Sequence, residues 1–323
     1  MPVYAFIFPG QGSQFAGMGR DLAAAFAPAR EVFQEVDDAL GERLSKLMFA
    51  GPPEELTLTQ NAQPALMAVS LAVLRVLEDE GGLDLAGKAA VVAGHSLGEY
   101  AALAAAGSMG VAQTARLLRL RGSAMQRAVP TGEGGMAALI GVELEQAREI
   151  CAAAVLLRIE GRPDQREVIE VANDNGGGQV VISGAIAAIN RAIDIAKSRG
   201  IRRAMLLPVS APFHCSLMAP AADVMREALG EADIAMPRLP LIANVTAAKA
   251  SEPDEIRDLL VRQVTATVRW RESVQAMTAL GVDSFIELGA GKVLSGLCKR
   301  IAPDAATRCA GTPDEIETLL KLL

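Results

Sequence analysis

The chain has 323 residues, of which 51% are hydrophobic and 21% charged, and this allows one large α/β domain or two smaller ones. Its formal net charge of −7 is the opposite of the basic stripe that a nucleic-acid surface needs, and its apolar runs are too short or too broken to span a membrane. We therefore expect neither nucleic acid nor a membrane among its partners.

Strand and helix patterns alternate in the first part of the chain, which is typical of an α/β fold. Short continuous apolar runs predict strands that are buried on both faces, and apolar residues at helical spacing predict helices that pack on a sheet. The expected elements are, in chain order, a strand at 3–8, a helix at 67–80, a strand at 88–94, and helices at 95–109 and 111–129.

The order of elements then changes to β-α-β-β-α-β, which is the order of a ferredoxin-like split βαβ unit. The expected elements are a strand at 134–142, a helix at 143–154, strands at 166–174 and 177–184, a helix at 185–200 and a strand at 202–208. The charged segment 156–167 is expected to be an exposed loop of this unit.

The α/β character resumes afterwards, with strands expected at 240–245 and 284–289. The sequence therefore predicts an α/β fold in which a ferredoxin-like subdomain is inserted into a larger domain with a mainly parallel sheet. We expect the larger domain to comprise residues 1–132 and 207–323, and the small subdomain to comprise residues 133–206.

Cysteine and histidine usage bears on location and on metal binding. The N-terminus has no signal-peptide pattern, and the cysteines lack CxxC spacing, which is typical of reduced thiols in a cytoplasm. We therefore expect a cytoplasmic protein. Only two histidines are present, and neither stands in a metal-ligand spacing, so we expect no metal site. The four cysteines are Cys151, Cys215, Cys298 and Cys309.

The sharpest motif is GHSLG at residues 94–98, which fits G-x-S-x-G between a predicted strand and a predicted helix. A serine on such a turn has a strained backbone and an exposed Oγ, and the flanking glycines avoid Cβ clashes. The helix N-terminus behind it points N–H groups at a developing oxyanion. The motif predicts Ser96 as a nucleophile; the alternative is that Ser96 only caps the helix.

A nucleophilic serine needs a base, for which His95 and His214 are the available histidines. Neighbouring side chains on a tight turn point in different directions, so we do not expect His95 to reach Ser96. His214 follows a strand and a proline, at a loop position where sites in α/β sheets gather, and we predict it as the base. The alternative is a buried histidine without a catalytic role. For the group that orients the imidazole, Asp174, Asp194 and a backbone or amide carbonyl all stay open.

Arg121 is a further candidate, because it precedes Gly122 near what could be the end of an amphipathic helix. One interpretation is a C-terminal charge that the helix dipole favours. The other is a binding group for a substrate carboxylate, since a guanidinium forms a planar bidentate pair that lysine does not reproduce. The residues alone leave both open.

The Gly-rich segment FPGQGSQFAGMG follows the first predicted strand and invites comparison with phosphate-binding loops. Its spacing from Gly12 to Gly17 suits a P-loop, but Met18 and Gly19 stand where Lys and Ser or Thr are needed. The dinucleotide pattern G-x-G-x-x-G fails as well, because its third glycine position is Phe15. Such a turn can instead supply an oxyanion-hole donor to a nucleophile elbow.

Six segments resemble, in content and in order, those of the malonyl-CoA:acyl carrier protein transacylases: FPGQGSQ, GHSLGEY, LRLRGSAMQ, NDNGGGQVVISG, APFHC and LVRQ. The resemblance covers nearly the whole chain and implies a hydrolase-like α/β core with an inserted ferredoxin-like subdomain. It also implies transfer of a malonyl group from malonyl-CoA to the phosphopantetheine thiol of acyl carrier protein, through a malonyl-serine intermediate, for fatty-acid synthesis. Malonyl-CoA would be the donor substrate, with no permanently bound cofactor.

The resemblance further implies catalytic roles for particular residues. Ser96 would be the nucleophile and His214 its base. The backbone N–H groups of Gln11 and Leu97 would stabilise the oxyanion. Gln263, in LVRQ, would supply the carbonyl that holds the imidazole, and in that case no carboxylate is needed for this task.

The resemblance also implies substrate contacts. Arg121 would bind the malonyl carboxylate, and Asn175 would lie in a loop of the small subdomain near the site. Phe213 before the histidine resembles the malonyl-selective pattern rather than the small residue of many methylmalonyl-selective domains.

Three alternative functions stay open at this stage. A serine thioesterase or another hydrolase could use the same elbow. A malonyl transferase could serve another acceptor, as a component of a malonate decarboxylase or as a stand-alone polyketide acyltransferase. A binding module with an inert serine is the alternative that involves no catalysis.

Overall fold

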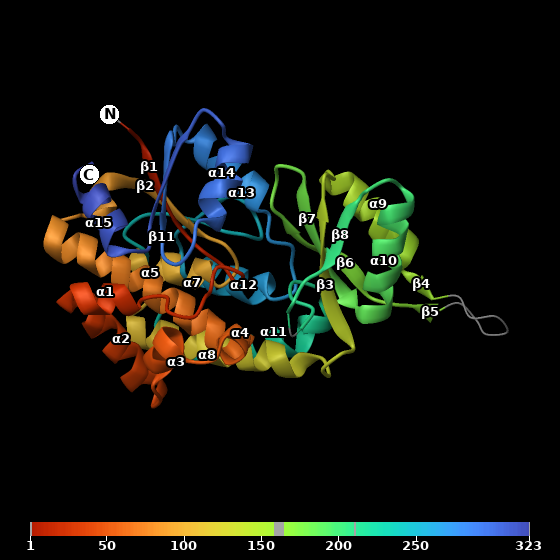
Figure 1. The fold of residues 1–323 in the computed structure, drawn as a ribbon, viewed down its shortest axis with the longest axis horizontal. Coiled ribbons are helices and arrows are strands. Elements are labelled where there is room, and N and C mark those ends of the chain that lie inside the picture. The colour runs from red at the N-terminus through yellow and green to blue at the C-terminus, as the bar shows by residue number, and fades with distance from the viewer. Residues whose placement is uncertain (1, 158–164, 210, 323) are drawn as a thin grey trace.

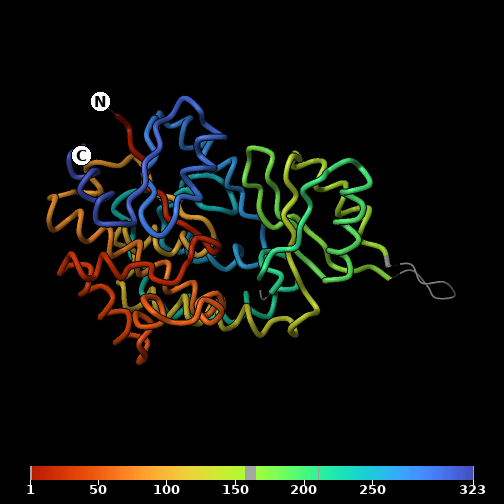
Figure 2. The backbone as a smooth tube through the Cα atoms, viewed as in Figure 1, coloured from red at the N-terminus to blue at the C-terminus, as the bar shows by residue number. Residues whose placement is uncertain are grey.

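The computed structural model describes residues 2–157, 165–209 and 211–322. The chain forms a larger part around a six-stranded sheet and a smaller part around a four-stranded sheet, which lie side by side along the long axis (Figure 1). Both termini lie at the end of the larger part that faces away from the smaller one (Figure 2). The predicted loop at 156–167 lies partly outside the described residues, because 158–164 are not among them.

The sheet of the larger part is mainly parallel, as the sequence predicts. Only β10 runs antiparallel to its neighbour. The central strand β1 is buried along its whole length, in agreement with its continuous apolar sequence. The strands in sheet order are β10 (Lys249–Ala250), β9 (Leu241–Ile242), β2 (Ala89–Gly94), β1 (Tyr4–Phe8), β11 (Ser284–Leu288) and β12 (Ala306–Ala310).

Helices cover both faces of this sheet. Alternate side chains of β1 point to opposite faces and so belong to two different cores. Phe6 and Phe8 face the larger core, to which α2, α5, α7 and α8 contribute, whereas Ala5 and Ile7 face a second core with α13 and α14. The helices of the larger part are α1 (Arg20–Ala25), α2 (Ala27–Leu40), α3 (Leu44–Ala50), α4 (Pro53–Thr57), α5 (Thr59–Gly81), α6 (Leu85–Lys88), α7 (Gly98–Ala105), α8 (Val111–Ala128), the 3₁₀ helix η1 (Ser216–Met218), α11 (Ala219–Glu231), α12 (Pro253–Gln263), α13 (Trp270–Ala279), α14 (Val293–Ile301) and α15 (Pro313–Leu320).

The long helices α5 and α8 pack closely against each other in the larger core. A Cβ atom on Gly122 of α8 would lie 2.5 Å from the Cα of Gln60, so only glycine allows this approach. The crossing brings Gln63 of α5 beside Arg121 of α8. Helix α5 begins eight residues before the predicted helix at 67–80, because its first turns contain polar residues and Pro64, which hide the helical period.

The smaller part is an antiparallel sheet covered by two helices, α9 (Leu144–Ala154) and α10 (Ile186–Ser198). Its strands lie in the order β6 (Ile169–Asp174), β7 (Gln179–Ala185), β3 (Gly134–Ile140) and β8 (Arg203–Leu206). This order, with the β-α-β-β-α-β sequence of elements, is that of a ferredoxin-like unit and confirms the predicted fold class. The exact domain limits at 132/133 and 206/207 stay a prediction.

Several strands differ from the sequence-based expectation, and two of them form at the ends of the predicted loop 156–167. The predicted strand 166–174 is divided: β5 (Gln165–Arg166) pairs with β4 (Leu156–Leu157), and β6 begins at Ile169. The edge strands β10 and β12 were not predicted, because β10 is two residues long and β12 has no continuous apolar run.

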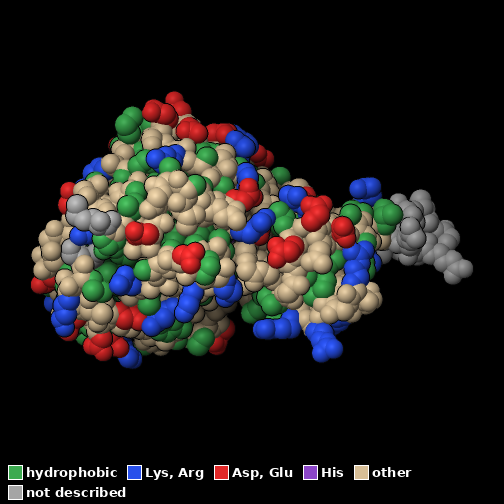
Figure 3. Space-filling view, turned by 90° about the horizontal axis from the view of Figure 1, so that it is seen from above, with side chains coloured by type: hydrophobic (Ala, Val, Ile, Leu, Met, Phe, Trp, Pro, Cys, Tyr) green, Lys and Arg blue, Asp and Glu red, His purple; other side chains and the backbone are tan. Residues whose placement is uncertain are grey.

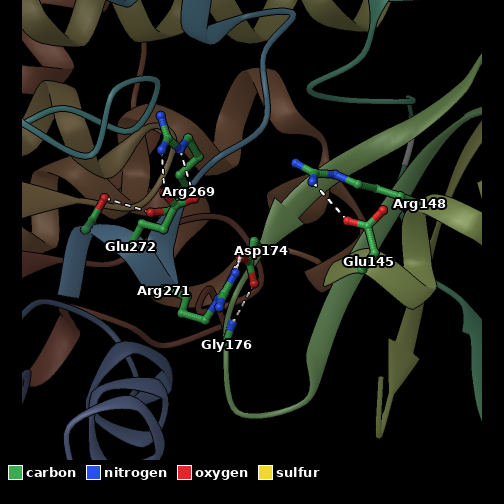
Figure 4. Close-up of polar contacts among 8 residues, drawn as sticks. Glu145, Arg148, Asp174, Gly176, Arg269, Arg271 and Glu272 are labelled. Carbon is green, nitrogen blue, oxygen red and sulfur yellow. Dashed lines mark hydrogen bonds and ion pairs between the residues drawn. The ribbon is translucent and has the colours of Figure 1, made fainter. Parts of the chain in front are cut away.

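Polar contacts join the two parts beside the end of β6 (Figure 4). Arg271 of α13 donates from Nε to Oδ2 of Asp174 at 2.8 Å, and Oδ1 of Asp174 accepts from the amide of Gly176 at 3.3 Å. The amide of Asp174 also donates to the carbonyl of Val268 at 3.0 Å. These contacts fix the β6–β7 turn, which carries Asn175, against the larger part.

On the face that Figure 3 draws, neither acidic nor basic side chains dominate. Figure 3 shows acidic and basic side chains interspersed over one face of both parts. In the part of the chain that the structure describes, no helix is long and apolar enough to cross a membrane.

Candidate active site

Ser96 lies on a tight turn between β2 and α7, at the carboxyl edge of the parallel sheet. Its φ of 55° places a non-glycine residue in the left-handed region, which is the strain expected of a nucleophile elbow. A Cβ on Gly94 would lie 1.9 Å from backbone atoms of Gly98, and a Cβ on Gly98 would lie 2.2 Å from the carbonyl oxygen of Phe8. The two glycines of the motif therefore allow the turn to pack on itself and on β1.

Ser96 does not cap α7, so the alternative interpretation of the motif is wrong. The N-cap position of α7 is Leu97, and no side chain caps the helix there. The Ser96 hydroxyl instead faces His214, and the Ser96 amide donates to Oδ1 of Asn244 at 2.8 Å.

Ser96 and His214 form a hydrogen-bonded pair. The distance from Ser96 Oγ to His214 Nε2 is 2.7 Å, and the distance from His214 Nδ1 to the Gln263 carbonyl oxygen is 2.8 Å. Because a carbonyl can only accept, Nδ1 carries the proton and Nε2 is free to accept from the serine hydroxyl. The carbonyl thus occupies the position of the third member of a catalytic triad.

The environment keeps His214 neutral. Burial is the largest cause, with the nearby Arg121 charge second, and together they lower the pKa of His214 to about 3. At neutral pH the imidazole is therefore unprotonated and able to take a proton.

His95 has a different partner, as the sequence argument predicts. Its Nε2 lies 2.9 Å from Oδ1 of Asn175, and its ring packs at a tilt on Trp270. Neither candidate carboxylate holds the imidazole of His214, because Asp174 pairs with Arg271 and Asp194 lies exposed on α10.

Arg121 lies in the middle of α8 and not at its end, so the helix-dipole explanation is wrong. Its side chain is 1% exposed. It donates to Gln63 Oε1 at 2.7 Å, to Gln263 Oε1 at 2.9 Å and to Ser96 Oγ at 3.2 Å. All three acceptors are neutral, so this buried cation has no ion-pair partner among the described residues, and it lies beside the serine hydroxyl.

Burial lowers the pKa of Arg121, but a guanidinium stays protonated at neutral pH. A buried charge without a paired charge is costly unless a ligand supplies one. The arrangement therefore suits an anion, and the planar fork of arginine suits a carboxylate.

Gln11 and Leu97 line the same cavity as Ser96. Within residues 2–157, 165–209 and 211–322, neither of their backbone amides donates to a protein acceptor. Free N–H groups next to a nucleophile are the donors that a developing oxyanion requires.

The predicted site residues meet around one cavity of about 500 Å³, which is large enough for a small organic substrate. Gln263 lies behind this cavity, fully buried against His214 and Arg121. The predicted residues that line the cavity are Gln11, Ser96, Leu97, Arg121, Asn175, Phe213 and His214. No group of three or more His, Cys, Asp or Glu side chains in the described residues could hold a metal ion.

Sequence reasoning missed four buried polar residues that support the site. Gln63 accepts from Arg121, and Thr59 links Gln63 to the Gln11 side chain through bonds of 2.8 Å each. Asn244 Oδ1 accepts from the Ser96 amide of the elbow, and Glu99 Oε2 accepts from Gln263 Nε2. No local pattern singles these residues out, because Gln63, for example, lies among the other polar residues of the first turns of α5.

A family model described as the acyl transferase domain matches residues 5–301. The chain belongs to this acyl transferase family. Its nucleophile elbow and Ser–His pair lie within the matched range.

Curated relatives of this acyl transferase align over its whole length. A malonyl CoA-acyl carrier protein transacylase of Bacillus subtilis (strain 168) is 41% identical over 100% of this chain and 98% of its own. A protein of the same name from Escherichia coli (strain K12) is 43% identical over 100% of both chains.

Solved structures agree with the fold of this acyl transferase. An acyl-carrier-protein-S-malonyltransferase from Bartonella henselae has a TM-score of 0.93 at 53% identity and covers 99% of both chains. A malonyl-transacylase in complex with a type II PKS acyl-carrier protein has a TM-score of 0.92 at 40% identity, over 99% of this chain and 100% of that one.

Proposed function

We propose that this acyl transferase moves a malonyl group from malonyl-CoA to the phosphopantetheine thiol of acyl carrier protein, through a malonyl ester on Ser96, in the supply of fatty-acid synthesis. The observation that carries this proposal is the Ser96–His214 hydrogen bond of 2.7 Å beside the buried guanidinium of Arg121. The names of the full-length relatives support it and do not favour a hydrolase or another acceptor. Malonyl-CoA is the donor substrate, and the reaction needs no resident cofactor.

In the first half-reaction, Arg121 binds the free carboxylate of the malonyl group. His214 Nε2 takes the proton from Ser96 Oγ, and the oxygen attacks the thioester carbonyl. The negative charge that develops on the carbonyl oxygen is stabilised by the amides of Gln11 and Leu97. The C–S bond then breaks, and His214 gives its proton to the leaving CoA thiolate.

In the second half-reaction, the carrier thiol takes the place of CoA. His214 Nε2 accepts the thiol proton, and the sulfur attacks the malonyl-Ser96 ester. The tetrahedral intermediate uses the same two amides, and its collapse returns the proton to Ser96 Oγ. Phe213 and Asn175 line the cavity, where they shape the space around the acyl group and exclude water.

The protein acts in the cytoplasm in this proposal. The cysteines support this location, because all four are free in the structure and three are buried.

Replacing Arg121 by alanine is expected to lower acylation by malonyl-CoA roughly 10²- to 10⁴-fold, because two charge-assisted hydrogen bonds of ~1.5–3 kcal/mol each are lost. Acylation by acetyl-CoA, which carries no second carboxylate, should be kept or improved. The measurement is the single-turnover rate of acyl-enzyme formation with each donor.

The matched control is Arg116→Ala, an exposed arginine of the same helix, which should leave both rates unchanged. An equal loss with both donors in Arg121→Ala would remove Arg121 from the carboxylate role.

The acylation rate should have no acid limb near the usual histidine pKa of about 6.5. Because the pKa of His214 is lowered to about 3, the base stays unprotonated as the pH falls through the range in which a free imidazole gains its proton. Single-turnover acylation followed from about pH 5 to pH 8 should therefore be nearly flat. A decline centred near pH 6.5 would show that His214 titrates normally.

The function is tested by the fate of the malonyl group in steady state. The chain is incubated with malonyl-CoA, with and without acyl carrier protein, and free malonate and malonyl-carrier are quantified. The proposal expects malonyl-carrier as the main product, with competing acceptors transferring more slowly. Mostly free malonate in both mixtures would establish a hydrolase instead.

A further inference from the structure

Glu99 is a buried carboxylate behind the site that the reaction described above does not use. It lies in the first turn of α7, three residues after Ser96, and is 0% exposed. A carboxylate at this depth needs good hydrogen bonds to offset its loss of hydration.

One oxygen of Glu99 makes all of its hydrogen bonds. Oε2 accepts from the amide of Asn244 at 3.0 Å and from Nε2 of Gln263 at 2.9 Å. Oε1 has no hydrogen-bond partner among the described residues. The contacts of Glu99 are thus concentrated on the two residues that hold the elbow and the histidine.

Gln263 connects Glu99 to His214, Arg121 and Ser96. Its carbonyl oxygen accepts from His214, its Oε1 accepts from Arg121, and its Nε2 donates to the Ser96 carbonyl at 3.0 Å as well as to Glu99. Since arginine can only donate, Oε1 must face Arg121. The amide group Nε2 then needs an acceptor on the other side, and Glu99 provides it.

We propose that Glu99 is a positioning residue, whose Oε2 holds the Gln263 side chain so that Gln263 Oε1 orients the Arg121 guanidinium toward the carboxylate of the acyl donor. This inference rests on the proposed function, because it assigns Glu99 to the selection of a malonyl over an acetyl donor. Glu99 touches neither the donor nor the reacting atoms.

The acceptor oxygen, and not the negative charge, is what this arrangement requires. Burial raises the pKa of Glu99 to about 7, so both protonation states are present near neutral pH. A proton on the unpartnered Oε1 leaves the two bonds to Oε2 intact. The charged group that faces Glu99 is Arg121, which lowers this pKa less than burial raises it. Glutamine at position 99 therefore imitates the protonated form.

The test compares Glu99→Ala with Glu99→Gln by single-turnover acylation with malonyl-CoA and acetyl-CoA. Alanine should lower the malonyl-to-acetyl rate ratio about tenfold or more, the size expected when a hydrogen bond that supports a charged group is lost. Glutamine keeps an acceptor oxygen and should retain the ratio within about threefold.

Two results would overturn the inference. Equal losses with both donors in Glu99→Ala would give Glu99 a purely structural role, and a loss of the ratio in Glu99→Gln as large as in Glu99→Ala would show that the charge is what matters. Arg121→Ala in the same assay distinguishes a failure of this inference from a failure of the proposed carboxylate role of Arg121. If it changes the ratio and Glu99→Ala does not, only this inference fails; if it leaves the ratio unchanged, the carboxylate role of Arg121 fails with it.

Glu287 provides a matched control, because it is also 0% exposed and accepts from backbone amides, those of Leu294 and Ser295. Glu287→Ala should lower the melting temperature without changing the malonyl-to-acetyl ratio. The malonyl-to-acetyl ratios of Glu99→Ala and Glu287→Ala are compared at an equal loss of melting temperature, so that a change in Glu99→Ala alone indicates positioning and not general destabilisation. Glu99→Gln provides a folded variant if Glu99→Ala does not fold.

Discussion

Replacing Ser96 by alanine is expected to eliminate the malonyl-enzyme and to lower transfer by about 10⁴- to 10⁶-fold, the range observed when a serine nucleophile is removed. The reason is that no other hydroxyl lies within hydrogen-bonding distance of His214 Nε2 in the described residues. The measurement is the intact mass of the protein after a short pulse of malonyl-CoA, together with the rate of malonyl-carrier formation.

The control for this variant is Ser198→Ala, which removes an exposed serine hydroxyl at the end of α10 that donates to the carbonyl of Ile195. It should acylate like the unaltered chain. A malonyl adduct that persists in Ser96→Ala would place the nucleophile elsewhere.

Replacing His214 by alanine is expected to slow acylation by about 10⁴-fold or more, because the proton of Ser96 then has no acceptor. The single-turnover rate of acyl-enzyme formation measures this loss directly. The Ser96 amide keeps its bond to Asn244 in this variant, so the elbow should keep its shape.

His95→Ala is the matched comparison, since it removes the other histidine, whose Nε2 contacts Asn175 and not Ser96. We expect its loss to be about tenfold at most, from weaker packing beside the elbow. The reverse order of the two losses would contradict the assignment of His214 as the base.

The elbow could be predicted from the sequence because its chemistry is local. Gly94, Ser96 and Gly98 lie within five residues, and the strain at Ser96 follows from the short turn between a strand and a helix. His214 could be inferred by elimination, since the chain has one other histidine and that one is the neighbour of Ser96.

The partners of these residues could not be predicted from local pattern. The Gln263 carbonyl that holds His214 is a backbone group, which any residue offers, so only the family resemblance indicated it. The contact of Arg121 with Gln63 arises where α5 and α8 cross at Gly122, and the contact of Glu99 with Gln263 joins α7 to the end of α12. Such contacts between elements far apart in the sequence depend on packing, which single-sequence periodicity does not encode.

The fold, like the site, could be predicted where its sequence pattern is local and strong, and not elsewhere. Buried strands such as β1 and the ferredoxin-like order of the small part have strong patterns, whereas β10 and β12 lie at the edges of the sheet. An edge strand buries little apolar surface, so its sequence carries little signal. The middle of the predicted loop, residues 158–164, lies outside the described residues.

The proposed mechanism requires a malonyl group on Ser96 as an intermediate on the way to the carrier. The most direct measurement is a pulse of malonyl-CoA, removal of the free donor, and a chase with acyl carrier protein, followed by intact-mass and peptide analysis. We expect one malonyl group on the peptide that contains Ser96, and we expect it to move to the carrier much faster than it is lost to water. A malonyl adduct that is released as malonate at the same rate with and without the carrier would contradict the proposed mechanism.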